Sequence, residues 1–265
     1  QPEAWAPEDI LRIRSHALVS NVTSEVARAQ VACAAGVAAD RLRRKLEPSH
    51  ETKVPAGLDP CVVPADVLKD YLLATEQVSF EALAKGGRHA EASAQVKLAQ
   101  ALDAYQNEGS NNWVIAPSRT ATGRPILAND PHRAVTAPSL RYIAHLSAPD
   151  LDIIGAGEPA MPGVSFDHNR DIAWDMTIFY IDQEDLYVYD TQGDAYRYKG
   201  GWEPRKVVHE TIEVKGEAPR EVVLKFTRHG PVIYETADSG KGGHAFAMRT
   251  VWNLPGSSGY FGSSR

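Results

Sequence analysis

The sequence predicts an α+β fold, in which a helical N-terminal part is followed by an antiparallel β-rich part. Apolar residues recur at helical spacing over the first third of the chain. From Trp113 onward, short runs rich in β-branched and aromatic residues alternate with turn formers. Helices followed by a run of strands, without an internal repeat, are typical of this fold class.

The first third of the chain carries the helix signals. One helix is expected to open at Pro7-Glu8-Asp9, because acidic residues suit the first turn. Another is expected over residues 22–37, closing at Gly36 or shortly after, and a third from Asp66 through Leu73. Residues 47–64 carry four prolines and a glycine, which indicates an irregular crossing segment. Residues 82–105 read as a weakly amphipathic surface helix or a spacer.

The strands are expected after this helical part. Glycine-containing turns separate several of them, at Gly193, Gly200 and Gly216. The predicted strands span residues 113–116, 125–128, 172–180, 186–190, 207–214, 221–226 and 244–251.

Composition narrows the class of protein. The 265 residues are 43% hydrophobic, enough for a packed core, and the net charge of -6 argues against nucleic-acid and anionic-membrane partners. No run of 18 apolar residues predicts a membrane span, and the N-terminus has no signal-peptide pattern and no initiator methionine, as in a processed chain or a fragment. Cys33 and Cys61 fit no metal spacing; they are either small buried side chains or, in an oxidising compartment, a disulfide.

Gly109-Ser110-Asn111-Asn112-Trp113 is the most informative segment. It places a serine directly after a glycine, at the start of a predicted strand. A serine hydroxyl is a poor nucleophile unless a base accepts its proton. If the Gly109–Ser110 bond were cut, the new α-amino group of Ser110 would supply that base, since its reference pKa is about 7.7–8.0. The alternative is an ordinary Gly-Ser turn before a strand.

An ordered series of motifs follows this segment. Asn129-Asp130-Pro131-His132 comes first, then Pro162-Gly163-Val164-Ser165-Phe166-Asp167-His168-Asn169, then Trp174, then Asp182-Gln183-Glu184-Asp185. In this order and spacing the series resembles the penicillin acylase family of N-terminal-nucleophile hydrolases, which includes acyl-homoserine-lactone and aculeacin-type acylases. The resemblance extends over most of the chain.

This resemblance implies a precursor that cuts itself between Gly109 and Ser110 and then hydrolyses a linear acyl amide through an acyl-enzyme on Ser110. Residues 1–85 would be the helical end of the small α subunit, 86–109 a spacer or the end of that subunit, and 110–265 the start of the nucleophile β subunit. The mature enzyme would be an α/β heterodimer with part of a four-layer αββα sandwich. By the same resemblance it would be periplasmic or secreted.

The resemblance also assigns site residues. His132 would orient the hydroxyl or the amino group of Ser110, and the backbone N–H of Ile178 would stabilise the oxyanion. A second donor, an asparagine, is expected beyond this chain, so that the chain by itself is expected to be a poor catalyst. Arg133 would favour a polar or anionic acyl group or point to solvent. Three further positions either line the acyl pocket or are ordinary core residues of strands, namely Phe166, Ile178 and Tyr180. Trp113 is expected to be a core residue.

A calcium site is implied as well. Asp182, Glu184 and Asp185 match a calcium-binding stretch, with Glu25 as the ligand from the helical part, and Glu184 would offer its backbone carbonyl. Hard cations bind several oxygens, carboxylate and carbonyl alike. The alternative is a solvated acidic loop.

Two positions depart from the family pattern. Asp167 and Asp175 stand where relatives commonly have glycine. If those positions require a positive φ, aspartate is tolerated better than most residues, although at a cost.

Three interpretations therefore remain open. The first is an amidohydrolase of the penicillin acylase type, whose acyl group the sequence does not name. The second is another N-terminal-nucleophile amidase, although those that use Thr or Cys lack this Ser-Asn-x-Trp start. The third is a noncatalytic, unprocessed calcium-binding fragment.

Overall fold

The computed structural model of the chain describes residues 21–43, 49–75, 109–132, 135, 137–158, 163–177, 182–237 and 242–250. They divide into two compact units. The first unit contains the described residues from 109 to 177, and the second contains those of 21–75 and 182–250. The helix predicted at Pro7-Glu8-Asp9 and the one in 82–105 lie outside the described residues.

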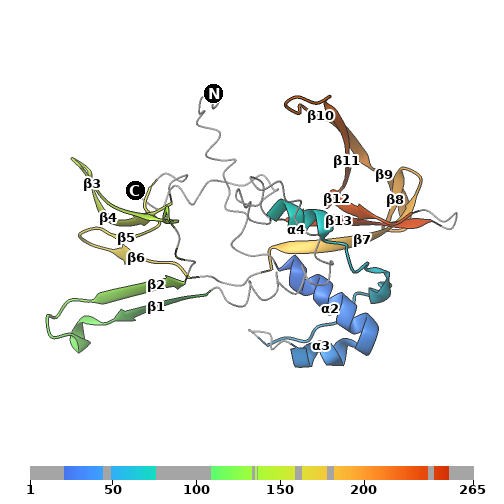
Figure 1. Cartoon of the computed structure of the whole chain (residues 1–265). Helices are drawn as coiled ribbons and strands as arrows, with labels where there is room; N and C mark the ends of the chain where they lie inside the picture. Colours follow the sequence, from blue (N-terminus) through green and yellow to red (C-terminus); the bar gives the residue numbers. More distant parts are fainter. Residues whose placement is uncertain are drawn as a thin grey trace. The chain divides into compact units, whose positions relative to one another are not determined.

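The second unit is built on an antiparallel sheet. Its strands are β7 (Glu184–Gln192), β8 (Ala195–Tyr198), β9 (Gly201–Pro204), β10 (Lys206–Ile212), β11 (Arg220–Thr227), β12 (Gly230–Glu235) and β13 (Gly243–Thr250). The order across the sheet is β10-β11-β12-β13-β7-β8-β9 (Figure 1). The turns at Gly193 and Gly200, where φ is 55° and 83°, connect β7 to β8 and β8 to β9, as the sequence predicts.

Two helices pack on this sheet, α2 (Val22–Ala35) and α4 (Lys69–Thr75). A further helix, α3 (Val37–Arg43), follows Gly36, whose φ of 83° ends α2 where the sequence predicts. The core cluster joins the helical segments to β13 and consists of Val22, Val26, Ala27, Val67, Leu68, Phe246 and Met248. Burying a large apolar side chain in such a cluster stabilises the fold by about 1.5–3 kcal/mol.

A disulfide closes the helical part. Cys33 in α2 is bonded to Cys61 in the short 3-10 helix η1 (Pro60–Val62), and their Cα atoms are 4.9 Å apart. The pairing that the sequence left open is therefore present. Apart from η1, the described residues 49–64 form no regular element, which confirms the predicted irregular crossing segment. Closing a loop of this length stabilises the fold by about 3.5 kcal/mol in the chain-entropy model.

The first unit holds two smaller antiparallel sheets. One is a hairpin of β1 (Gly109–Ile115) and β2 (Ile126–His132), and the other has the order β3-β4-β5-β6. The second sheet's strands are β3 (Tyr142–Ala148), β4 (Leu151–Gly157), β5 (Phe166–His168) and β6 (Ala173–Trp174). The strand predicted over 172–180 is thus only the short β6 within the described residues. At its start, Asn169 Oδ1 accepts hydrogen bonds from the backbone N–H groups of Asp171 and Ile172, and the Asn169 N–H donates to the backbone oxygen of Ile172, which forms a turn. Strands β3, β4 and β5 of this sheet were not predicted, and neither were β8, β9 and β12 of the second unit.

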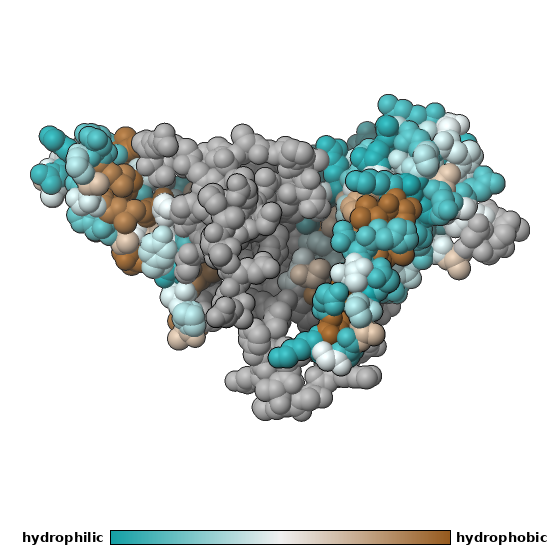
Figure 2. Space-filling view, turned by 90° about the horizontal axis from the view of Figure 1, so that it is seen from above, coloured by the Kyte–Doolittle hydropathy of each residue, from teal (hydrophilic) through white to brown (hydrophobic). Residues whose placement is uncertain are grey.

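Several large apolar side chains of the first unit are exposed. Trp113 is 52% exposed and Ile143 83%, and hydrophobic residues are visible on this part of the surface in Figure 2. The expectation that Trp113 is a core residue is therefore wrong for the described part of the chain. The physical reason is that β1 and β2 form a two-stranded ribbon, with which no other strand of the described residues pairs.

The described residues are mostly antiparallel β structure with few helices, which confirms the predicted α+β class in its coarse form. Helices from residues 21–75 and strands from residues 182–250 share one core, so the second unit contains residues from both sides of Ser110. The subunit boundary at Ser110 stays a prediction. Within the part that the structure describes, no helix has both the length and the apolar character needed to cross a membrane.

Candidate functional site

The β1–β2 hairpin brings the predicted cleavage site, Gly109–Ser110, next to His132. Its register pairs Gly109 with His132 and Ser110 with Pro131. Side chains alternate between the faces of a strand. The imidazole of His132 is therefore on the face that Gly109 leaves open, and the hydroxyl of Ser110 is on the opposite face.

Ser110 lies at the start of β1 and is half-buried. Its Oγ donates a hydrogen bond to the carbonyl oxygen of Gly109 at 2.7 Å. The hydroxyl is thus directly beside the carbonyl group of the peptide bond that precedes it. This placement suits attack on that carbonyl, provided that the proton of the hydroxyl is removed.

His132 ends β2 and is held by two neighbours. Its Nε2 lies 3.0 Å from Asp130 Oδ2 and 3.1 Å from the side-chain nitrogen of Asn111. Asn111 and Asp130 are directly opposite each other in the hairpin. The role of His132 in orienting Ser110 stays a prediction. The contacts of His132 with Asn111 and Asp130 were not predicted from the sequence.

The segment before Ile178, the predicted oxyanion donor, is hydrogen-bonded to the same hairpin. Asn129 of β2 donates a hydrogen bond from Nδ2 to the backbone oxygen of Met176 at 3.1 Å. Met176 precedes Ile178 by two residues. Ile178, Arg133 and Tyr180 themselves lie outside the described residues.

Phe166, the remaining predicted pocket residue, is half-buried in β5. The guanidinium of Arg141 lies 4.9 Å from the centre of its ring, and Arg141 is paired with Glu158 at 3.2 Å. One face of the phenyl ring is therefore covered by a cation that is already neutralised.

Asp167 is buried beside Phe166, and neither of its carboxyl oxygens has a hydrogen-bond partner among the described residues. It lies opposite Gly155 in β4 and Trp174 in β6. Burial raises the pKa of Asp167 to about 6, against a small opposing effect of His168. Burial also raises the pKa of Asp175. Neither aspartate has a positive φ, so the strain considered for these glycine-like positions does not arise.

We expect Asp167→Asn to change the pH dependence of the first unit's stability. The raised pKa means that the folded form keeps its proton to a higher pH than the unfolded chain. The stability that this provides is present below about pH 4 and is lost as pH rises through about 6, a difference of about 3 kcal/mol. Asp167→Asn should therefore stabilise β4 and β5 at pH 7 and leave them unchanged at pH 4.

Hydrogen exchange of the β4 and β5 peptides between pH 4 and 7.5, corrected for intrinsic exchange, measures this effect. Asp150→Asn, an exposed aspartate in the turn between β3 and β4, is the matched control and should follow the unmodified protein. Equal pH dependence in all three proteins would contradict the assignment.

The second unit holds a cluster of carboxylates. Glu25, Asp182 and Asp185 each place one oxygen within 4.8 Å of the others. Burial first, and then the charges of Asp182 and Asp185, raise the pKa of Glu25 to about 8. A hard divalent cation with several oxygen ligands offsets such repulsion. The donor set therefore fits the calcium ion that the sequence resemblance implies.

Glu184 contributes to this region differently from its neighbours. Its buried carboxylate accepts hydrogen bonds from the hydroxyl of Tyr71, at 3.0 Å, and from the backbone N–H of Val22, at 3.3 Å. The carboxylate thus sits at the N-terminus of α2, where the helix dipole favours a negative charge. Its backbone oxygen, the predicted ligand atom, accepts a hydrogen bond from the side chain of Asn21 at 2.7 Å.

Asn21 joins the helical part to the acidic loop. Its Nδ2 donates to Asp182 Oδ1 at 2.7 Å, and its Oδ1 accepts from the backbone N–H groups of Gln183 and Glu184 at 3.0 Å. Sequence analysis did not single out this residue. An asparagine directly before a helix indicates an N-cap, yet the side chain makes no capping bond to α2.

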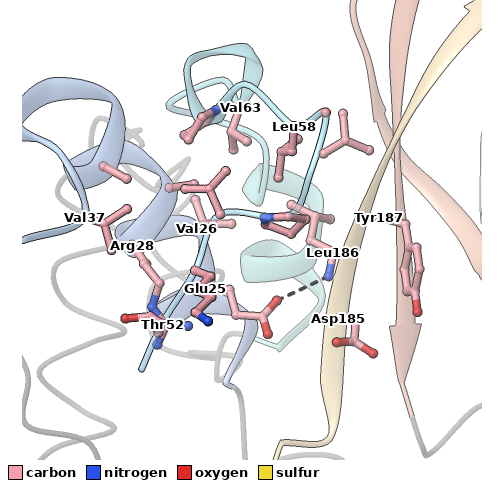
Figure 3. A pocket seen from close by; sticks show the side chains of 18 of the residues that line it. Glu25, Val26, Arg28, Val37, Thr52, Leu58, Val63, Asp185, Leu186 and Tyr187 are labelled. Carbon is pink, nitrogen blue, oxygen red and sulfur yellow. Dashed lines mark hydrogen bonds between the residues drawn. The ribbon is translucent and has the colours of Figure 1, made fainter. Parts of the chain in front are cut away.

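A pocket of about 600 Å³ adjoins the carboxylate cluster (Figure 3). Side chains of α2, the crossing segment and β7 line it, with Val26, Leu58 and Leu186 among the apolar ones. Glu25 reaches from α2 toward β7 and accepts a hydrogen bond from the backbone N–H of Leu186 at 3.3 Å. Phe166, the one predicted acyl-pocket residue that the structure describes, is not among the residues that line it.

Comparison with known proteins identifies the family. The model of the family described as penicillin amidase matches residues 1–264. The chain therefore belongs to the penicillin amidase family. This confirms the resemblance that the sequence motifs indicate.

Individual proteins are similar to parts of the chain. It is 42% identical over 146 residues to penicillin acylase 2 proenzyme of Pseudomonas sp. (strain SE83), covering 54% of this chain and 18% of that protein. It is 30% identical over 258 residues to acyl-homoserine lactone acylase QuiP of Pseudomonas fluorescens (strain Pf0-1), covering 94% of this chain and 30% of that protein.

A solved structure of a family member also matches. The thermostable penicillin G acylase from Alcaligenes faecalis has a TM-score of 0.45 and 28% identity, covering 54% of this chain and 26% of that chain. The chain thus spans less than a third of the length of these relatives.

Proposed function

We propose that this chain carries the cleavage site and the nucleophile of an acyl-amide hydrolase of the penicillin amidase family. Self-cleavage between Gly109 and Ser110 would expose Ser110 as the N-terminal residue of a second subunit. The hydrogen bond from Ser110 Oγ to the Gly109 carbonyl oxygen at 2.7 Å is the observation that carries this proposal.

The reaction has two stages in this proposal. In the first, Ser110 Oγ bonds to the carbonyl carbon of Gly109, the C–N bond breaks, and water hydrolyses the ester that results. In the second, Ser110 Oγ attacks a substrate amide while its free α-amino group accepts the proton. The backbone N–H of Ile178 stabilises the oxyanion, together with a donor contributed by the rest of the enzyme.

The substrate is a small acyl amide, and the mature enzyme is an α/β heterodimer cut from one precursor. Phe166, Ile178, Tyr180 and Arg133 contribute to the acyl pocket. The sheets of both units belong to the layers of an αββα sandwich. The Cys33–Cys61 disulfide supports an oxidising, periplasmic or secreted location.

A serine-directed sulfonyl fluoride tests the nucleophile in the complete protein. The mass of the reagent is expected on the fragment that begins at Ser110, and not on uncut protein. Labelling of uncut protein and cut protein to the same extent would contradict the requirement for a free amino group.

Calcium is proposed as a structural ion, held by Glu25, Asp182, Asp185 and the backbone oxygen of Glu184. Its charge would neutralise the cluster and fasten α2 to the acidic loop that precedes β7. The same observation favours the second candidate function, a calcium-binding fragment that never cuts itself. Intact-mass measurement separates the two.

Chelation is expected to lower the melting temperature of the protein, because removing the ion leaves three carboxylates in mutual repulsion. Asp182→Asn should melt below the unmodified protein in excess calcium and above it in excess chelator. Glu210→Gln, an exposed carboxylate of the same unit, is the control and should respond to chelation as the unmodified protein does. A melting curve that does not change on chelation would rule out this ion as a stabiliser.

A further inference from the structure

The side chain of Asn21, the residue directly before α2, lies against the acidic loop of residues 182–185. We propose that Asn21 is a positioning residue for calcium: it does not bind the ion, but it holds the Asp182 carboxylate and the Glu184 carbonyl in the orientation that binding requires. The inference rests on the proposed calcium ion. It adds a residue that the pattern of acidic ligands in the sequence does not contain.

The side-chain amide of Asn21 uses its full hydrogen-bonding capacity on this loop. Its Nδ2 donates to Asp182 Oδ1 and to the backbone oxygen of Glu184, each at 2.7 Å. Its Oδ1 accepts from the backbone N–H groups of Gln183 and Glu184, each at 3.0 Å. A side-chain amide has two donor hydrogens and two acceptor lone pairs. Because two oxygens lie on one side and two N–H groups on the other, the orientation of the amide is defined.

These hydrogen bonds leave the ligand groups able to bind an ion. Asp182 has a second carboxyl oxygen, and the carbonyl oxygen of Glu184 has two lone pairs, of which the bond from Nδ2 uses one. Calcium accepts both kinds of oxygen in flexible geometry. The oxygen of Asn21, by contrast, is directed at two backbone N–H groups. Asn21 therefore orients ligands and is not itself one.

The backbone of Asn21 reaches the ligand on the helical side. Its carbonyl oxygen accepts the N–H groups of Ser24, at 2.9 Å, and Glu25, at 3.1 Å, in the first turn of α2. The side chain makes no capping bond to that helix. Asn21 thus connects Glu25 through its backbone to Asp182 through its side chain, and so it links the two halves of the carboxylate cluster.

Asn21→Ala is expected to weaken calcium binding by about 10- to 100-fold, the usual effect of removing a hydrogen-bond partner of a metal ligand. The complete protein is first freed of the ion with a chelator, and the chelator is dialysed away. Isothermal titration calorimetry with calcium chloride then gives the affinity. Asn21→Ser keeps a residue that suits a helix start and one hydroxyl group, so its affinity should lie between those of Asn21→Ala and the unmodified protein.

Tyr71→Phe is the matched control, because it also removes a hydrogen bond to the acidic loop. The Tyr71 hydroxyl donates to Glu184 Oε1 at 3.0 Å, on a carboxylate that is not a predicted ligand. This variant should melt at a lower temperature by the same amount in excess calcium and in excess chelator, and its calcium affinity should be unchanged. In Asn21→Ala, by contrast, calcium at a fixed, subsaturating concentration should raise the melting temperature less than in the unmodified protein.

Three results would count against this role. An unchanged calcium affinity in Asn21→Ala, or an equal loss of affinity in Tyr71→Phe, overturns the positioning role of Asn21 and leaves the calcium ion in place. An unmodified protein that binds no calcium overturns the proposed ion itself, and this inference with it.

Discussion

Ser110→Ala is expected to leave the protein as one uncut chain, whereas the unmodified protein separates into two. The physical reason is that the Ser110 hydroxyl, hydrogen-bonded to the Gly109 carbonyl oxygen, is the only group that the proposal gives for attack on that carbonyl. Hydrolysis of an amide without a positioned nucleophile is extremely slow, so the effect is all-or-none on the timescale of expression. Intact-mass measurement of the purified proteins gives the result.

Two variants control this prediction. Ser110→Cys should still be cut, because a thiolate also attacks a carbonyl, although it should turn over substrate poorly. Ser118→Ala, in the turn of the same hairpin, should be cut as the unmodified protein is. A processed Ser110→Ala protein would contradict the intramolecular mechanism.

Gly155→Ala is expected to lower the stability of the first unit strongly. Strands β4 and β5 approach so closely there that an added Cβ would lie 2.1 Å from the backbone oxygen of Phe166 and 2.2 Å from Asp167 Cβ. Backbone atoms cannot move aside as a flexible side chain can, so the strands must separate. We expect a loss of about 3 kcal/mol or more, at the upper end for overpacking.

Hydrogen exchange of β4 and β5 measures this loss, and a separated pair should exchange much faster. Gly201→Ala is the matched control, because it also adds a methyl group to a strand glycine but meets its nearest atom at 3.8 Å. Equal protection of β4 and β5 in Gly155→Ala and the unmodified protein would contradict the close approach.

Local sequence signals predicted a large part of the fold. Gly36 marks the end of α2, and glycine turns mark the β7–β8–β9 hairpins, because each needs a backbone conformation that glycine adopts readily. Strands β3 and β4 escaped prediction because their apolar residues do not alternate clearly with polar ones. The packing of α2 on the sheet of the second unit could not be predicted either, because α2 and β13 are far apart in the sequence and meet only in the core.

In the candidate site, too, local sequence signals located some residues, whereas residues whose contacts depend on the fold were missed. The motif around Ser110 and the acidic loop could be located from residue order, and the structure places Glu25 beside Asp182 and Asp185. Sequence analysis did not single out Asn21, which bonds to the acidic loop, or Asp130, which contacts His132. These contacts run across the fold or along one face of a strand, which composition does not encode. Strand alternation in Asn129-Asp130-Pro131-His132 would have placed Asp130 and His132 on one face.

The most direct test of the central claim is the N-terminal sequence and intact mass of each species in the purified, unmodified complete protein. The account predicts two species, one of which begins Ser110-Asn111-Asn112. A single uncut chain, or a cut at any other peptide bond, would contradict it.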